Sequence, residues 1–66
     1  MRLAALTARE REVALAVASG ASNAEVAATL FMSGATVKAH VSRLFAKLDV
    51  TNRVQIAIVV HDAEHA

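Results

Sequence analysis

The chain has 66 residues with a formal net charge of +1, and its hydrophobic residues make up 56% of the total although only 3% are aromatic. This length allows one small domain with a core of Ala, Val, Leu and Ile. The absence of Cys excludes disulfides and thiolate zinc sites. No apolar run reaches the roughly 18 residues of a membrane span and no signal-peptide pattern is present, so a soluble, cytoplasmic chain is expected.

Capping boxes predict where three helices begin. The patterns occupy residues 7–10, 22–25 and 52–55, where Thr, Ser or Asn is followed three residues later by Glu or Gln. They predict helices over about 7–19, 23–31 and 53–61, the first of which ends at Gly20. Thr51 is a competing cap for the last of these helices.

The stretch 33–48 predicts a fourth helix, capped by Ser33, with two different faces. Its apolar face is formed by Val37, Val41, Leu44 and Leu48, which fall within about 40° of one another, flanked by Phe45. Its other side carries Ala35, Lys38, Ala39, Ser42, Arg43 and Ala46. That side is small, polar and basic with no acid, which is typical of a helix that enters a DNA groove. The alternative is a solvated face that happens to lack acids.

Charge and spacing both point to the centre of the chain. Residues 33–53 carry four Lys or Arg against one Asp, a local charge of +3. The helix over 23–31 buries Val26, Ala27 and Leu30, and at most three residues separate it from the next helix. So short a connection forces a steep crossing, as in a helix-turn-helix.

These elements predict an all-α fold, a four-helix bundle with short loops, in which 1–6 are a lead-in, 7–61 the domain and 62–66 a tail.

Residues 56–60 are five consecutive apolar residues, of which a helix needs to bury only two or three. We expect Ala57, Ile58 and His61 on the inner side. Ile56, Val59, Val60 and Ala63 then form a second apolar stripe. The alternative is a strand, which nothing else in the chain could pair with.

Five motifs together resemble the LuxR-type helix-turn-helix domain, found in NarL/FixJ-type response regulators and quorum-sensing regulators. They are L-T-x-R-E at 6–10, G-x-S-N-x-E-V-A at 20–27, L-F-x-S-x-x-T-V-K-x-H-V at 30–41, L-x-x-K-L at 44–48 and N-R-V-Q at 52–55. The resemblance covers about residues 6–61 and implies a four-helix bundle. Its second and third helices form the helix-turn-helix, and its fourth helix often dimerises.

The resemblance also implies the site and the partners. The DNA-facing positions map to Ala35, Thr36, Lys38, Ala39, Ser42 and Arg43, with Asn23 and Lys47 as phosphate contacts. The apolar stripe of Ile56, Val59, Val60 and Ala63 is then the dimerisation surface. The implied partners are double-stranded DNA, a second copy of the chain on DNA, RNA polymerase and an N-terminal receiver or sensor domain. No cofactor is expected, and we expect a fragment of a larger regulator.

The chain departs from the family pattern at two places. Ala14 and Ala16 stand where larger aliphatic residues are usual and Leu15 where a polar residue is usual, which leaves the orientation of the first helix open. Ala35 and Ala39 stand where many members carry longer polar side chains. Base recognition is therefore expected to use fewer hydrogen bonds, with alanine touching a thymine methyl group.

Parts of the sequence also suggest three other functions. Residues 61–65 match the H-x-x-E-H pattern of inverted zincins, but no downstream residue supplies a third ligand and the domain has no room for a cleft, so no enzyme is expected. His40 is expected to pack beside the core rather than bind metal. A helical protein-interaction module that uses the apolar stripe of the last helix is the stronger alternative. A sigma-factor-like region is disfavoured by the specific S-N-x-E-V-A and T-V-K-x-H-V pair.

Overall fold

The computed structural model describes residues 2–65, and this range contains no strand. A short 3-10 helix, η1 (Arg2–Ala5), precedes four α-helices: α1 (Ala8–Ala18), α2 (Asn23–Leu30), α3 (Gly34–Leu48) and α4 (Arg53–Glu64). The all-α prediction is confirmed, and the run at 56–60 is helical. None of these helices is both long and apolar enough to cross a membrane.

Polar side chains at the predicted caps start the helices. The Thr7 hydroxyl accepts a hydrogen bond from the backbone N–H of Glu10 at 3.1 Å, and the Glu10 carboxylate accepts one from the backbone N–H of Thr7 at 2.9 Å. Ser22 and Glu25 repeat this box at 3.1 and 2.8 Å. The side chain of Ser33 caps α3. Each such cap stabilises its helix by about 1 kcal/mol, a substantial amount for a small domain.

The box at 52–55 forms in a modified way. Asn52 Oδ1 accepts a hydrogen bond from the backbone N–H of Gln55 at 2.9 Å, as expected. Gln55 Oε1, however, accepts hydrogen bonds from the backbone N–H and the hydroxyl of Thr51, at 2.6 and 3.0 Å. Asn52 is therefore the cap of α4, whereas Thr51, the competing candidate, does not cap the helix but binds the Gln55 side chain.

Two residues in the left-handed backbone conformation end helices α2 and α3. Phe31 after α2 and Asp49 after α3 have φ values of 56° and 55°. The N–H groups of Met32 and Val50 then bond to carbonyls five residues back, at 2.9 and 3.0 Å, and both side chains pack against the core. Only residues 31–33 therefore separate α2 from α3, which is the expected helix-turn-helix connection.

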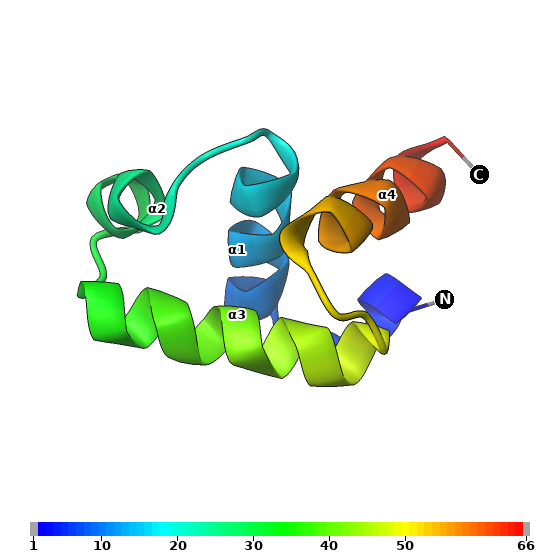
Figure 1. Cartoon of the computed structure of the whole chain (residues 1–66), viewed down its shortest axis with the longest axis horizontal. Coiled ribbons are helices and arrows are strands. Elements are labelled where there is room, and N and C mark those ends of the chain that lie inside the picture. Colours follow the sequence, from blue (N-terminus) through cyan, green and yellow to red (C-terminus); the bar gives the residue numbers. More distant parts are fainter. Residues whose placement is uncertain (1, 66) are drawn as a thin grey trace.

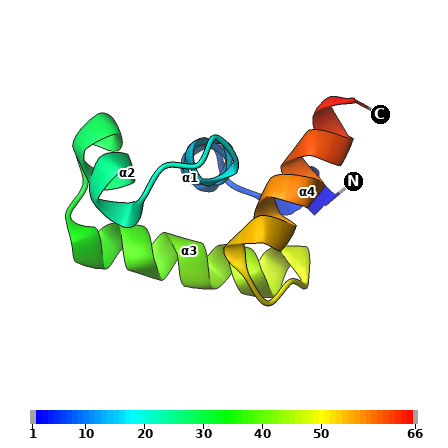
Figure 2. The same ribbon diagram turned by 45° about the horizontal axis from the view of Figure 1, so that its top comes forward.

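The other three α-helices pack against one side of α3. Figure 1 shows it running along the length of the molecule, with α1, α2 and α4 on one side. In Figure 2, α1 is seen end-on between α2 and α4, again above α3. In neither view does another helix cover the opposite side of α3.

The core is aliphatic, as the composition predicted. Its buried hydrophobic residues are Leu3, Leu6, Val13, Ala14, Val17, Val26, Val37, Val41, Leu44, Leu48, Ile56 and Val60. The four residues predicted for the apolar face of the stretch 33–48 are all among them. Ala27 and Leu30 of α2 are partly buried against the same core, so the predicted inner face of that helix is confirmed. Phe31, in contrast, is 94% exposed.

The predicted orientation of α4 was wrong. Ile56 and Val60, expected on a spare outer stripe, are 0% and 1% exposed and belong to the core. Ile58, expected inside, is 53% exposed, and His61 is exposed as well. Five apolar residues in a row make several faces of a helix similarly hydrophobic, so packing against α1 decides the rotation.

The two ends of the domain are more ordered than the sequence suggested. The described part of the segment 1–6, expected as a lead-in, places Leu3 and Leu6 in the core. Helix α4 continues to Glu64, three residues beyond the expected end. In α1, Ala14 is buried whereas Leu15 is 42% exposed, which settles the orientation that the sequence had left open.

We predict that Val41→Asp unfolds the domain, whereas Ser42→Asp does not. Val41 is buried between the helices, and an unpaired buried carboxylate costs more than a marginal domain can offset. Ser42 is the exposed neighbour on the same helix and is therefore a matched control. Far-ultraviolet circular dichroism and thermal melting measure both variants. Native melting of the Val41→Asp variant would show that α3 is rotated differently.

Candidate nucleic-acid interface

The outer face of α3 includes the six residues predicted to face DNA. All of them are exposed: Ala35, Thr36, Lys38, Ala39, Ser42 and Arg43. They lie on the side of the helix away from its buried stripe, because positions about 180° apart on a helix face opposite directions. The structure thus brings these exposed residues together on the side of α3 that no other helix covers in Figure 2.

Two free cations set the charge of the outer face of α3. Lys38 and Arg43 are exposed, and neither makes a hydrogen bond or an ion pair within residues 2–65. Between them lie the short side chains of Ala39 and Ser42. Such a surface allows a polyanion to approach closely while both cations keep their freedom to contact it.

Thr36 stands at the edge of this surface and is already oriented by the cap. Its backbone N–H donates to the Ser33 hydroxyl at 3.1 Å, and the two hydroxyl groups lie 2.9 Å apart. The first turn of α3 is therefore fixed by local hydrogen bonds. It presents an exposed Thr side chain next to Ala35.

Lys47, predicted as a phosphate contact, is engaged inside the domain. Its Nζ lies 2.7 Å from Oε1 of Glu10 and 3.4 Å from the carbonyl oxygen of Ala5. The side chain of Glu10 is only 5% exposed, so this ion pair links α1 to the end of α3 in a partly dry environment. A DNA phosphate would have to compete with this carboxylate for Lys47, and phosphate contact by Lys47 remains a prediction.

The surroundings of Glu10 strongly favour its charged form. The hydrogen bond from Lys47, and next the hydrogen bond from the backbone N–H of Thr7, lower the pKa of Glu10 from 4.5 to about 2. Glu25 occupies the equivalent place in the second capping box. Its pKa is lowered by the hydrogen bonds of Ser22, but the described chain offers it no cationic partner.

Asn23, the other predicted phosphate contact, also has an internal partner. Arg53 donates from Nη1 to Oδ1 of Asn23 at 2.6 Å and from Nη2 to the carbonyl oxygen of Ala21 at 2.8 Å. From its place in the sequence, Arg53 was recognised only as part of the positive charge. One sequence signal could have indicated this role. A cation in the first turn of a helix opposes the helix dipole, which points to a partner outside that helix.

The outward side of α4 differs from the predicted stripe. Val54 and Ile58, four residues apart, are 69% and 53% exposed. Ile58 and the half-buried Val59 border a shallow hollow that Val50, Gln55 and Asp49 complete. Of the four predicted dimerisation residues, Ile56 and Val60 therefore offer no surface, whereas Val59 and Ala63 offer only an edge.

The candidate metal motif at 61–65 is helical as far as Glu64. The rings of His61 and His65 stack with centroids 4.2 Å apart. In the part of the chain that the structure describes, no three metal-binding side chains come together. His40 is half-buried beside the core, and its Nδ1 has no partner.

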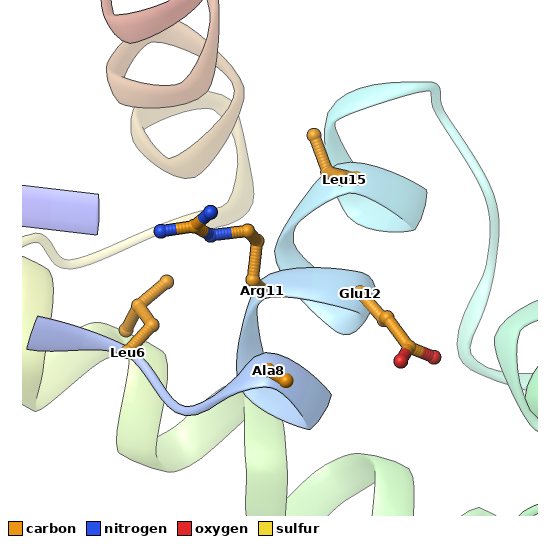
Figure 3. A pocket seen from close by; sticks show the side chains of 5 residues that line it. All are labelled: Leu6, Ala8, Arg11, Glu12 and Leu15. Carbon is orange, nitrogen blue, oxygen red and sulfur yellow. The ribbon is translucent and has the colours of Figure 1, made fainter. Parts of the chain in front are cut away.

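A second shallow hollow lies beside α1, away from the outer face of α3. Figure 3 shows the residues that line it: Leu6, Ala8, Arg11, Glu12 and Leu15. The Arg11 side chain extends toward η1, where it donates to the carbonyl oxygen of Leu3 at 3.4 Å, while Glu12 points away from it and pairs with Arg9. The hollow therefore holds no paired acid and base.

A short turn between α2 and α3, with an uncovered, positively charged face on α3, defines a helix-turn-helix protein of the DNA-binding class. Residues 4–60 match the family described as "Bacterial regulatory proteins, luxR family", and the chain belongs to this family. The resemblance drawn from the motifs is thereby confirmed. The chain is a DNA-binding domain of the kind found in transcriptional regulators, and it is not an enzyme.

Several similar proteins are named as regulators. The "Uncharacterized transcriptional regulatory protein YhcZ" of Bacillus subtilis is 55% identical over 53 residues, which cover 80% of this chain and 25% of that protein. The B. subtilis "Transcriptional regulatory protein LiaR" is 41% identical, over 85% of this chain and 26% of its own length. The "Response regulator protein VraR" of Staphylococcus aureus is 45% identical, over 80% and 25%. The chain thus spans about a quarter of the length of these relatives.

We predict that Glu10→Gln destabilises the domain in a pH-dependent way. Gln keeps the capping box but removes the charge that faces Lys47. Because the pKa of Glu10 lies below its ordinary value of 4.5 in the folded state, the stabilisation is present above about pH 4.5 and is lost as the pH falls toward 2. Urea midpoints of parent and variant should therefore converge on acidification.

Glu25→Gln is the matched control, because it alters the equivalent position of a capping box that has no lysine partner. Its effect at neutral pH should be smaller. A difference between the parent and Glu10→Gln that stays constant down to pH 3, or an equal effect of Glu25→Gln, would exclude the ion pair as the cause.

Proposed function

We propose that this chain binds double-stranded DNA in a sequence-specific manner, with α3 in the major groove, as the C-terminal effector domain of a two-component response regulator. The observation that carries the proposal is the outer face of α3, which is exposed, uncovered by other helices and free of acidic residues. An α-helix fits the width of the major groove, and a face of small residues reaches the base edges.

In this proposal the free cations make the polar contacts to DNA and the alanines make the apolar ones. Lys38 and Arg43 donate to guanine edges or to phosphates, since both are unpaired in the described structure. Ala35 and Ala39 offer methyl groups that fit against thymine methyls. Asn23 contacts the DNA backbone from the start of α2. Specificity then comes from few hydrogen bonds together with shape and apolar contact.

Two copies bind DNA together. One recognition helix reads only a few base pairs, which is too little discrimination for a genome. A symmetric pair needs a self-complementary surface, and the exposed Val54 and Ile58 of α4 supply an apolar one. The half-buried Val59 and Ala63 border it, whereas Ile56 and Val60 are excluded by their burial. The patch is small, so pairing depends on DNA.

The remaining partners follow from the larger relatives. Those proteins are about four times as long as the matched region, and VraR is named a response regulator. A receiver domain N-terminal to this domain would then control its access to DNA, and RNA polymerase would be the target of the bound regulator. DNA binding takes place in the cytoplasm, where the bacterial chromosome lies.

The second candidate function is a helical module that binds another protein through α4. The observation in its favour is the exposure of Val54 and Ile58, which no described residue covers. The two functions differ in their response to salt. DNA binding through Lys38 and Arg43 releases counterions and weakens as salt rises, whereas apolar contact does not.

We predict that Lys38→Ala weakens binding to a selected DNA site by roughly 1–3 kcal/mol if Lys38 reads a base edge. Titrations at several salt concentrations, on duplexes recovered from a random pool, measure the loss. A loss that is uniform across sequences, with a salt slope reduced by about 1, identifies a phosphate contact instead. Arg11→Ala is the control, because it removes the same charge outside the outer face of α3 (Figure 3). Equal binding by Lys38→Ala and parent would remove Lys38 from the interface.

We predict that Ile58→Glu impairs binding to a duplex with two half-sites far more than binding to one half-site. Glu at this exposed position brings two like charges together across the symmetry axis, while the monomer stays folded. The comparison of the two duplexes is its own control for direct effects on DNA contact. Equal losses on both duplexes, or none, would exclude this part of α4 from the dimer interface.

A further inference from the structure

Arg53 connects the start of α4 to the start of α2. Its guanidinium group reaches two acceptors there, Oδ1 of Asn23 and the carbonyl oxygen of Ala21, at 2.6 and 2.8 Å. The two hydrogen bonds span 30 and 32 residues of sequence. The planar fork of the guanidinium group uses both of its terminal nitrogens, which fixes its orientation as well as its position.

This contact serves α2 rather than the helix that carries Arg53. Arg53 is the first residue of α4, where the positive end of the helix dipole disfavours a cation. Within α4 it makes no hydrogen bond that would compensate. Its half-buried side chain is turned toward the segment around Asn23 instead.

Helix α2 depends on such contacts because its own packing is sparse. It has eight residues, of which only Val26 is buried. Arg9 of α1 donates to the carbonyl oxygen of Leu30 at the end of α2, and Arg53 holds its beginning. One arginine from α1 and one from α4 therefore secure the two ends of this short helix against the rest of the fold.

The same contact determines which way the Asn23 amide faces. Arginine has only donors, so the amide atom directed at Arg53 must be the oxygen. The NH2 group is then held on the other side, with no acceptor within residues 2–65. An amide fixed in this way loses less conformational entropy when it donates to an external oxygen.

We propose that Arg53 is a positioning residue for DNA binding: it holds the beginning of α2 and turns the Asn23 amide so that its NH2 group donates to a DNA phosphate. This role rests on the proposed function, in which Asn23 contacts the DNA backbone. Arg53 acts through Asn23 and does not itself touch the DNA. Its loss therefore weakens binding only while Asn23 is present.

A double-mutant cycle tests this dependence with Arg53→Met, Asn23→Ala and the double variant. The probe is a fluorescently labelled mixed-sequence duplex at low salt, since a phosphate contact requires no operator. We expect each single variant to lose roughly three- to tenfold in affinity, the range for one typical hydrogen bond. The double variant should bind about as well as Asn23→Ala alone. Additive losses would show that Arg53 contacts DNA directly and would overturn the positioning role.

Asn23→Asp separates positioning from folding. The carboxylate still accepts from Arg53, and a negative charge at the start of α2 favours the helix dipole, so the thermal midpoint should be kept or raised. Binding should nevertheless fall, because no NH2 group remains. Undiminished binding by Asn23→Asp would overturn the proposal.

Two further variants keep the outcome decisive. If Arg53→Met does not fold, Arg53→Lys replaces it, since lysine keeps the charge but lacks the fork needed for both acceptors. Arg11→Met controls for the lost charge. Full binding by Arg53→Lys and Arg53→Met would refute the inference while leaving DNA binding intact, whereas a parent chain that binds no duplex at all would refute the proposed function itself.

Discussion

One apolar stripe on α3 organises the domain. Val37, Val41, Leu44 and Leu48 are buried against α1, α2 and α4, so three helices share one side of a single helix. The stripe supplies four of the twelve buried hydrophobic residues in the described chain, and its burial stabilises the fold. It also leaves the opposite side of α3 uncovered by any other helix (Figure 2). The constraint that builds the core therefore also creates the surface that we propose binds DNA.

Much of this arrangement was predictable from local sequence. Capping residues fixed the helix starts, because each box needs only residues three apart, and the period of α3 fixed its buried face. The rotation of α4 was not predictable, since residues 56–60 are apolar on every side. The partners of Lys47 and Asn23 lie 37 and 30 residues away in sequence. No local pattern carries such information.

The four cations of the central stretch have two different functions. Lys47 neutralises a buried carboxylate and Arg53 secures the start of α2, so both are engaged within the protein. Lys38 and Arg43 are unpaired in the described structure. A charge count from sequence treats all four alike, although only two are free to neutralise phosphates. The salt dependence of binding should reflect the smaller number.

The separation of these two groups of residues has a consequence for divergence. None of the side chains between Lys38 and Arg43 on the outer face of α3 supports another helix, whereas the structural cations lie elsewhere. Surface substitutions away from caps and buried partners usually change stability by less than about 0.5 kcal/mol. Under the proposed function, a descendant gene can therefore acquire a new target sequence through substitutions at Ala35, Ala39 or Ser42 without first gaining stability elsewhere. The residues that hold the fold and the residues proposed to read the DNA sequence can evolve separately.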